Sequence, residues 1–140
     1  MLVIGSDHGG YTLKEHIKAY FEKEGIPFVD VGCDGESCDY PDIAKAAAAK
    51  ITSGECEKGI LCCGTGIGIS IAANKVRGIR AALVSEPVSA ALATEHNNAN
   101  ILCLGGRTIG PDMGVACIKA WMGASFLGDR HARRVGKIEG

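Results

Sequence analysis

The sequence has 140 residues, of which 46% are hydrophobic and 22% charged, and its net charge at pH 7 is −1. This length fits one domain over residues 1–140, with enough chain to bury a core. The near-neutral charge and the aromatic content of 5% argue against the basic, aromatic-rich surfaces that bind nucleic acid. No apolar run approaches the ~20 residues of a membrane span, and the first ten residues lack a signal-peptide pattern. We therefore expect a cytoplasmic protein without membrane contact.

Short apolar runs along the chain predict five strands, at residues 1–7, 27–32, 59–64, 79–85 and 100–106. Most of these runs are continuously apolar, which is typical of parallel strands that are covered on both faces.

Helical signals fill the intervals between these runs. Leu13, Ile17 and Phe21 mark one amphipathic face, and Gly25 is a fitting stop for that helix. The further helix signals are Pro41, with a helix to about Ser53, the stretch 68–75, a Ser85 cap, Pro111, and the basic stretch 129–138. This alternation predicts a Rossmann-like, three-layer α/β/α sandwich with a five-stranded parallel sheet.

Ligands of such sheets bind outside the carboxyl ends of the strands, which directs attention to the loops there. The loop in "GILCCGTGIGIS", residues 59–70, matches no standard phosphate loop. Its glycines follow G-x-G-x-G after the third strand, whereas the dinucleotide fingerprint is G-x-G-x-x-G after the first. No G-x-x-x-x-G-K-[ST] is present, and no arginine stands six residues after either cysteine.

The physical properties of this loop leave two interpretations open. Its glycines and the following helix start can present N–H groups to an anion, and that setting favours the thiolate form of a cysteine. The loop is therefore either a thiolate base beside an anion cradle or a tight turn around a buried cysteine.

Other polar residues near strand and helix ends are further candidates. Asp7 and His8 follow the first strand, and His96 stands at a helix end, although each can be a simple cap. Arg130 and Arg134 are four residues apart and share one helical face, as either a solvated basic face or a phosphate clamp.

The seven cysteines do not predict a disulfide framework or a metal site. Their number is odd, no pair has C-x-x-C spacing, and no His/Cys/Asp cluster has metal-ligand spacing. Most lie among apolar residues and are expected to be buried.

Taken together, the motifs resemble ribose-5-phosphate isomerase B, in the wider family that includes allose-6-phosphate and galactose-6-phosphate isomerases. The resemblance runs nearly end to end, and its motifs are "SDHGG", "DYPD", "GILCCGTGIGISIAANK", "GIRAALVSEP", "EHNNAN", "LGGRTIG" and "GDRHARRV". It implies interconversion of ribose 5-phosphate and ribulose 5-phosphate through a cis-enediolate, without metal or organic cofactor.

The resemblance also implies roles for particular residues. Cys63 matches the base that moves a proton between C1 and C2, and Cys62 is left to the core. The residues implied in ring opening and proton handling are Thr65, Asp7 and His96. The amides implied in an enediolate cradle are those of Gly64, Gly66, Ile67, Gly68 and Ser70. The residues implied in binding phosphate and sugar are His8, Arg107, Arg130, Arg134, Asn97 and Tyr40.

Members of this family are dimers or tetramers whose active sites form between subunits. The resemblance thus implies a homodimer or a dimer of dimers acting on a small sugar phosphate. Two alternatives remain at this point: a six-carbon substrate such as allose 6-phosphate, and a non-catalytic module that binds FMN or a nucleotide.

Overall fold

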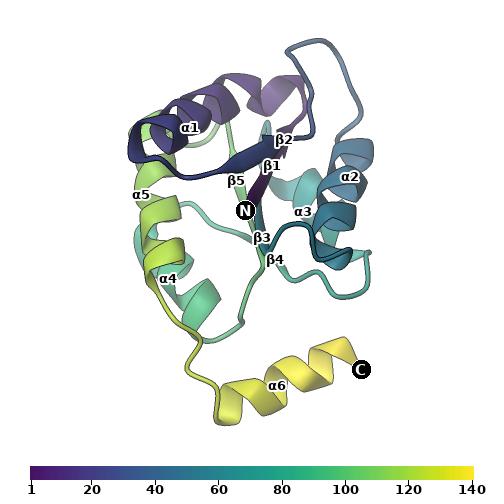
Figure 1. Ribbon diagram of the computed structural model, residues 1–140, viewed down its shortest axis with the longest axis vertical. Coiled ribbons are helices and arrows are strands. Elements are labelled where there is room, and N and C mark those ends of the chain that lie inside the picture. Colours follow the sequence, from purple (N-terminus) through teal and green to yellow (C-terminus); the bar gives the residue numbers. More distant parts are fainter.

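A single sheet of five parallel strands, in the order β2-β1-β3-β5-β4, forms the centre of the computed structural model, which describes residues 1–140 (Figure 1). The strands are β1 (Leu2–Ser6), β2 (Phe28–Asp30), β3 (Lys58–Cys63), β4 (Ala81–Leu83) and β5 (Ile101–Gly105). All five predicted strands are confirmed. In the register of the sheet, Ser6 pairs with Cys62 and Cys63 pairs with Gly105, so the carboxyl ends of the three central strands lie side by side.

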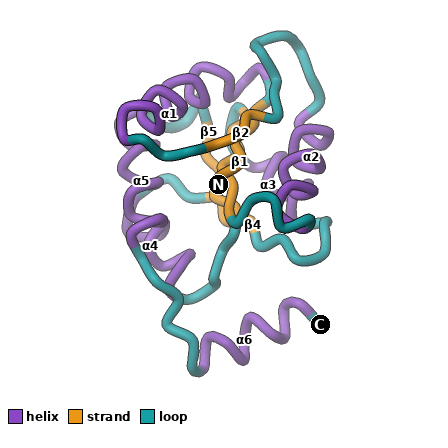
Figure 2. The backbone as a smooth tube through the Cα atoms, in the orientation of Figure 1, coloured by secondary structure: helices purple, strands orange, loops and turns teal.

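Helices cover both faces of the sheet, which confirms the three-layer sandwich. Helices α1, α4 and α5 pack on one face and α2 and α3 on the other (Figures 1 and 2). Their bounds, with those of a short 3-10 helix η1 and a final helix α6, are η1 (His8–Gly10), α1 (Tyr11–Glu24), α2 (Tyr40–Thr52), α3 (Ile67–Asn74), α4 (Pro87–Glu95), α5 (Pro111–Gly123) and α6 (Arg130–Glu139).

Two hydrophobic cores, one on each face of the sheet, follow from the period of two along each strand. Ile60 and Cys62 belong to the core under α1, α4 and α5, whereas Leu61 and Cys63 belong to the core under α2 and α3. The two adjacent cysteines therefore lie on opposite faces, as predicted.

The ends of α1 and α4 show one helix boundary that the sequence predicted and one that it did not. Gly25 ends α1 with a left-handed φ of 70°, a conformation that glycine adopts without steric cost. Ser85 is not the cap of α4, so that prediction was wrong. Because Pro87 takes the first helical position, Glu86 becomes the cap, and its carboxylate accepts hydrogen bonds from the amides of Val88 (2.7 Å) and Ser89 (2.9 Å).

The sequence also failed to predict one covalent link. Cys33 and Cys38 form a disulfide in the loop between β2 and α2, at a spacing of five residues that carries no sequence signal. The other five cysteines are free and buried, which agrees with the expectation for most of them.

Helix α6 lies apart from the sandwich (Figures 1 and 2). It is joined to the body through the buried side chain of His131 and an ion pair of 2.8 Å between Glu139 and Arg80. The rest of the helix is largely exposed. None of the helices is both long and apolar enough to cross a membrane.

Candidate active site

Backbone contacts join the loops that follow β1, β3 and β5 into one surface at the carboxyl edge of the sheet. The amide of Gly106 donates to the Cys63 carbonyl and that of Arg107 to the Gly64 carbonyl, both at 2.8 Å. The η1 turn packs so closely on β3 that a Cβ atom at Gly10 would collide with the carbonyl carbon of Cys62. Glycines are thus required here because backbone meets backbone.

The thiol of Cys63 lies where β3 ends and α3 begins. The amide of Gly66 donates to Cys63 Sγ at 3.1 Å, and the left-handed φ of 78° at Gly66 turns the chain into the helix. Gly66, the residue before α3, has no side chain to cap the helix, and the amides of Gly68 and Ile69 keep the unpaired, positively polarised N–H groups of a helix start. The Thr65 hydroxyl accepts a hydrogen bond from the Ile67 amide at 3.2 Å. This arrangement can hold a thiolate and an adjacent oxyanion.

The two adjacent cysteines have very different surroundings. Cys62 is completely buried in the core, and burial, followed by the neighbouring Cys63, raises the pKa of its thiol. Cys63 lies at the strand end, on the other face and next to the glycine loop. Of the two thiols, only that of Cys63 lies where it can serve as a base.

Several predicted site residues gather around this glycine loop. The Tyr40 ring packs against Gly68, where a Cβ atom would lie 2.7 Å from the ring, and the Arg107 guanidinium lies over Gly64. Asp7 caps η1 by accepting the Gly10 amide at 3.1 Å, so its cap role is real. A cavity of about 480 Å³ lies between the turn after β1 and the start of α2, and it is lined by Asp7, His8, Cys38, Asp39, Tyr40, Pro41 and Asp42.

The remaining candidates lie in the same chain at the opposite, amino edge of the sheet. His96 follows α4 and precedes β5, and Asn100, just before that strand, accepts a hydrogen bond from Gly59 near the start of β3. Because β3 has six residues, roughly 16 Å of strand separates this edge from Cys63. One chain therefore does not bring His96, Asn97, Arg130 or Arg134 to the thiol.

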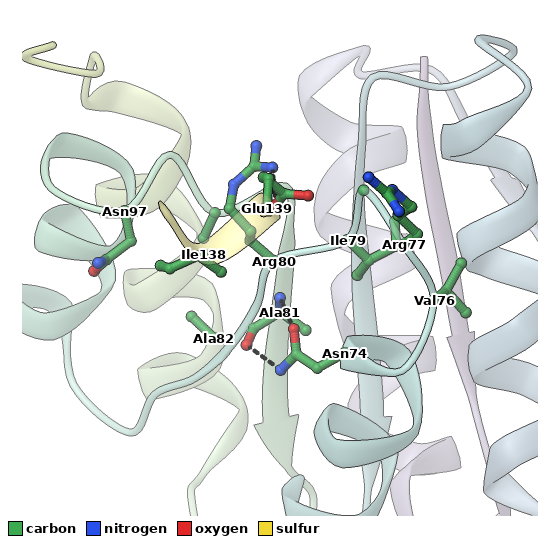
Figure 3. Close-up of a pocket in the computed structure, with 12 residues that line it drawn as sticks. Asn74, Val76, Arg77, Ile79, Arg80, Ala81, Ala82, Asn97, Ile138 and Glu139 are labelled. Atoms are coloured by element: carbon green, nitrogen blue, oxygen red, sulfur yellow. Dashed lines mark hydrogen bonds and ion pairs between the residues drawn. The ribbon is translucent and has the colours of Figure 1, made fainter. Parts of the chain in front are cut away.

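A second cavity, of about 510 Å³, lies at that amino edge between α6 and the start of β4. Asn97 and Ile138 line it, together with the Arg80–Glu139 ion pair (Figure 3). Asn74 holds its floor through two hydrogen bonds to the backbone of Ala81 (Figure 3).

A residue that sequence reasoning missed also lies at this edge. His131 is buried, its ring stacks on that of His96, and its Nε2 atom has no hydrogen-bond partner within the chain. Burial above all, and then the charges of His96, Arg130 and Arg134, lower the pKa of His131. The only available signal was its position between two arginines, which draws attention to the charges instead. No three His, Cys, Asp or Glu side chains lie close enough together to hold a metal ion.

A thiol beside open helix-start amides, at the carboxyl edge of a parallel sheet, defines an α/β protein built to bind a small anionic ligand. The sequence pattern of the ribose/galactose isomerase family matches residues 2–138. The chain therefore belongs to the ribose/galactose isomerase family.

Individual relatives agree with this membership. The chain is 44% identical to ribose-5-phosphate isomerase B of Escherichia coli, covering 98% of this chain and 93% of that one. It is 43% identical to D-erythrulose-4-phosphate isomerase of Pectobacterium atrosepticum, covering 98% and 91%. The solved structure of ribose-5-phosphate isomerase B from Mycoplasma genitalium with bound ribulose-5-phosphate is 41% identical and superposes with a TM-score of 0.94, covering 99% and 93%.

Proposed function

We propose that the protein is an aldose–ketose isomerase that interconverts ribose 5-phosphate and ribulose 5-phosphate, with Cys63 as the base. The observation that carries the proposal is the thiol of Cys63, 3.1 Å from the Gly66 amide at the open start of α3. A proton next to a carbonyl is removed when a base and an oxyanion cradle flank the same carbon, and this loop supplies both. The likeness to ribose-5-phosphate isomerases supports the substrate.

In the proposed reaction the thiolate of Cys63 takes the C2 proton of the open-chain aldose, which leaves a cis-enediolate. The negative oxygen is assigned to the amides of the segment 64–70. Those of Gly64 and Gly68 have no acceptor within the chain, whereas those of Gly66, Ile67 and Ser70 already donate to Cys63 Sγ, the Thr65 hydroxyl and the Gly66 carbonyl. The thiol then returns the proton to C1, so the substrate is isomerised and the base regenerated. Thr65, Asp7 and His96 are assigned to ring opening and to the protons on the sugar oxygens. The step needs no metal or organic cofactor.

The proposed enzyme is a homodimer, or a dimer of such dimers, whose sites combine two chains. A second copy would bring the amino edge of its sheet to the Cys63 loop of the first. His8 and Arg107 from one chain and Arg130 and Arg134 from the other would then enclose the phosphate, with Asn97 and Tyr40 on the sugar.

Exposed apolar surface supports this assembly. The edge strand β4 and its flanking helices α3 and α4 expose five large apolar side chains: Ile67, Ile71, Leu83, Val88 and Leu92. A free sheet edge lined with apolar residues favours association. A detached helix of ten residues, such as α6, is marginal by itself and gains stability from a partner.

Two other substrates have support from relatives. The family includes galactose isomerases, which supports a six-carbon sugar phosphate such as allose 6-phosphate, and two relatives are isomerases of the four-carbon D-erythrulose 4-phosphate. The test is kcat/KM of the pure protein, in chelator, for ribose 5-phosphate, allose 6-phosphate and erythrulose 4-phosphate. We expect the highest value for ribose 5-phosphate, and a preference for either other sugar would make that sugar the proposed substrate.

A coloured protein, or one that releases nucleotide on denaturation, would instead favour the FMN-binding module. The cytoplasmic location stays a prediction.

A further inference from the structure

A lysine without contact to solvent lies behind the proposed substrate site. The side chain of Lys14, on α1, is fully buried, and its ammonium group makes three short contacts. Nζ lies 3.0 Å from each carboxylate oxygen of Asp30, at the end of β2, and 2.6 Å from the carbonyl oxygen of Cys33. All three ammonium donors are therefore used, and two of the acceptors belong to one carboxylate.

Stability alone does not explain this lysine. Removing two charges from water costs several kcal/mol for each ion, and apolar residues in place of a buried ion pair often stabilise a protein. The pair instead fixes the backbone, because Asp30 also accepts the Gly32 amide at 2.8 Å. Burial opposes ionisation of Asp30, but hydrogen bonds from Lys18, Gly32 and Lys14 outweigh it and lower the pKa of that carboxyl.

The backbone fixed by Lys14 leads directly to the proposed site. The disulfide joins Cys33 to Cys38, and between them Gly35 lies next to the Tyr11 ring, which a Cβ atom at this glycine would approach to 3.4 Å. Cys38 lines the cavity at the carboxyl edge, and Tyr40 follows at the start of α2 with its ring against Gly68. Six residues separate the carbonyl held by Lys14 from the first residue of α2.

We propose that Lys14 is a positioning residue that sets Tyr40 for substrate contact by holding the segment 31–39 in place. The role of Tyr40 in this statement rests on the proposed function. The ammonium group acts at the Cys33 carbonyl, at a distance from the sugar, and its effect passes along the segment to the tyrosine ring.

A double-mutant cycle in the full-length protein tests this connection. Lys14→Met is expected to raise KM for ribose 5-phosphate by about tenfold while kcat changes less than about threefold, because a misplaced contact weakens binding without removing the base. If Lys14 acts through Tyr40, the double variant Lys14→Met/Tyr40→Ala matches Tyr40→Ala alone. KM effects that simply multiply would overturn the proposal.

Lys18→Met is the matched control. Lys18 also pairs with Asp30, at 2.9 Å, but it makes no contact with the Cys33 carbonyl. We expect its KM to equal that of the wild type, and an increase as large as that of Lys14→Met would reduce Lys14 to a general electrostatic role and refute the inference. Asp30→Asn keeps the volume of the side chain but removes its charge, and it replaces Lys14→Met in the test if Lys14→Met does not fold. We expect Asp30→Asn to raise KM as well.

A second readout separates this inference from the proposed function. Hydrogen exchange at the amides of Gly32 and Cys33, which donate to Asp30 Oδ1 and to the Ser6 carbonyl, is expected to accelerate by at least about tenfold in Lys14→Met, while amides of β3 and β5 keep their wild-type rates. A wild-type protein without isomerase activity would refute the proposed function, and the exchange result would still decide whether Lys14 holds the segment. Unchanged exchange at Gly32 and Cys33 would refute the inference even in an active enzyme.

Discussion

The imidazole rings of His96 and His131 stack almost parallel, with their centroids 4.3 Å apart and an angle of 8° between the planes. His96 comes from the end of α4 and His131 from the first turn of α6. The stack therefore links a proposed catalytic residue to the helix that carries the proposed phosphate-binding arginines. A displaced α6 would move both groups together.

The burial of His131 in this stack predicts how the stability of the protein depends on pH. Because the pKa of His131 is lower in the folded protein, the unfolded chain binds more protons below about pH 6.5. Stability is therefore expected to fall as the pH drops from about 6.5 through the folded pKa. The charged and titratable groups around His131 are His96, Asp129, Arg130 and Arg134.

His131→Phe keeps a flat ring against His96 but cannot take up a proton. The midpoints of urea denaturation at pH 5.5 and 7.5 measure the effect, and the difference between them is expected to be smaller in His131→Phe than in the wild type. An equal difference in both proteins would place the pH dependence elsewhere.

The two adjacent cysteines give a matched pair of variants. Cys63→Ala is expected to lower kcat by about 10²–10⁴-fold, the usual contribution of a general base, while the protein still folds. Cys62→Ala removes a sulfur from the core, so it is expected to keep most of the activity and to lose about 1 kcal/mol of unfolding free energy. Isomerisation rates and denaturant unfolding measure both effects, and wild-type turnover in Cys63→Ala would eliminate the proposed base.

A site shared between chains predicts complementation. Cys63→Ala and His96→Ala are each expected to be nearly inactive, but a hybrid dimer has one site with both residues intact. Random pairing of equal amounts after joint refolding is expected to restore about a quarter of the wild-type activity. Refolding each variant alone is the control, and a mixture no more active than its components would place both residues within one chain.

The arginines of α6 provide a test of phosphate binding. Arg134→Ala is expected to raise KM by about tenfold to a hundredfold, because a hydrogen bond to a charged group is worth about 1.5–3 kcal/mol. Arg133 is the control, since it is also exposed on the same helix but points about 100° away from Arg134 around the helix axis. Equal increases in KM for both substitutions would indicate a diffuse field around the helix.

Much of the fold could be predicted because its signals are local. Gly25, Pro41 and Pro111 each mark a helix boundary through their own backbone geometry, and the period of two assigns Cys62 and Cys63 to different faces. The family motifs supplied the candidate site residues.

The features that could not be predicted depend on residues that meet only after folding. The Cys33–Cys38 bond depends on the path of a loop, and the burial of Lys14 depends on where β2 ends. The burial of His131 also has no local signal, because the ring that covers it, that of His96, is 35 positions away in the sequence.

The close approach of the strand-end loops constrains how this protein can be redesigned. A Cβ atom at Gly106 would lie 2.7 Å from the Gly9 carbonyl oxygen, and one at Gly10 would strike Cys62. A larger residue at either glycine would push two of these loops apart. A search for new sugar specificity would therefore vary side chains that line the cavity, such as His8 and Tyr40, and leave these glycines unchanged.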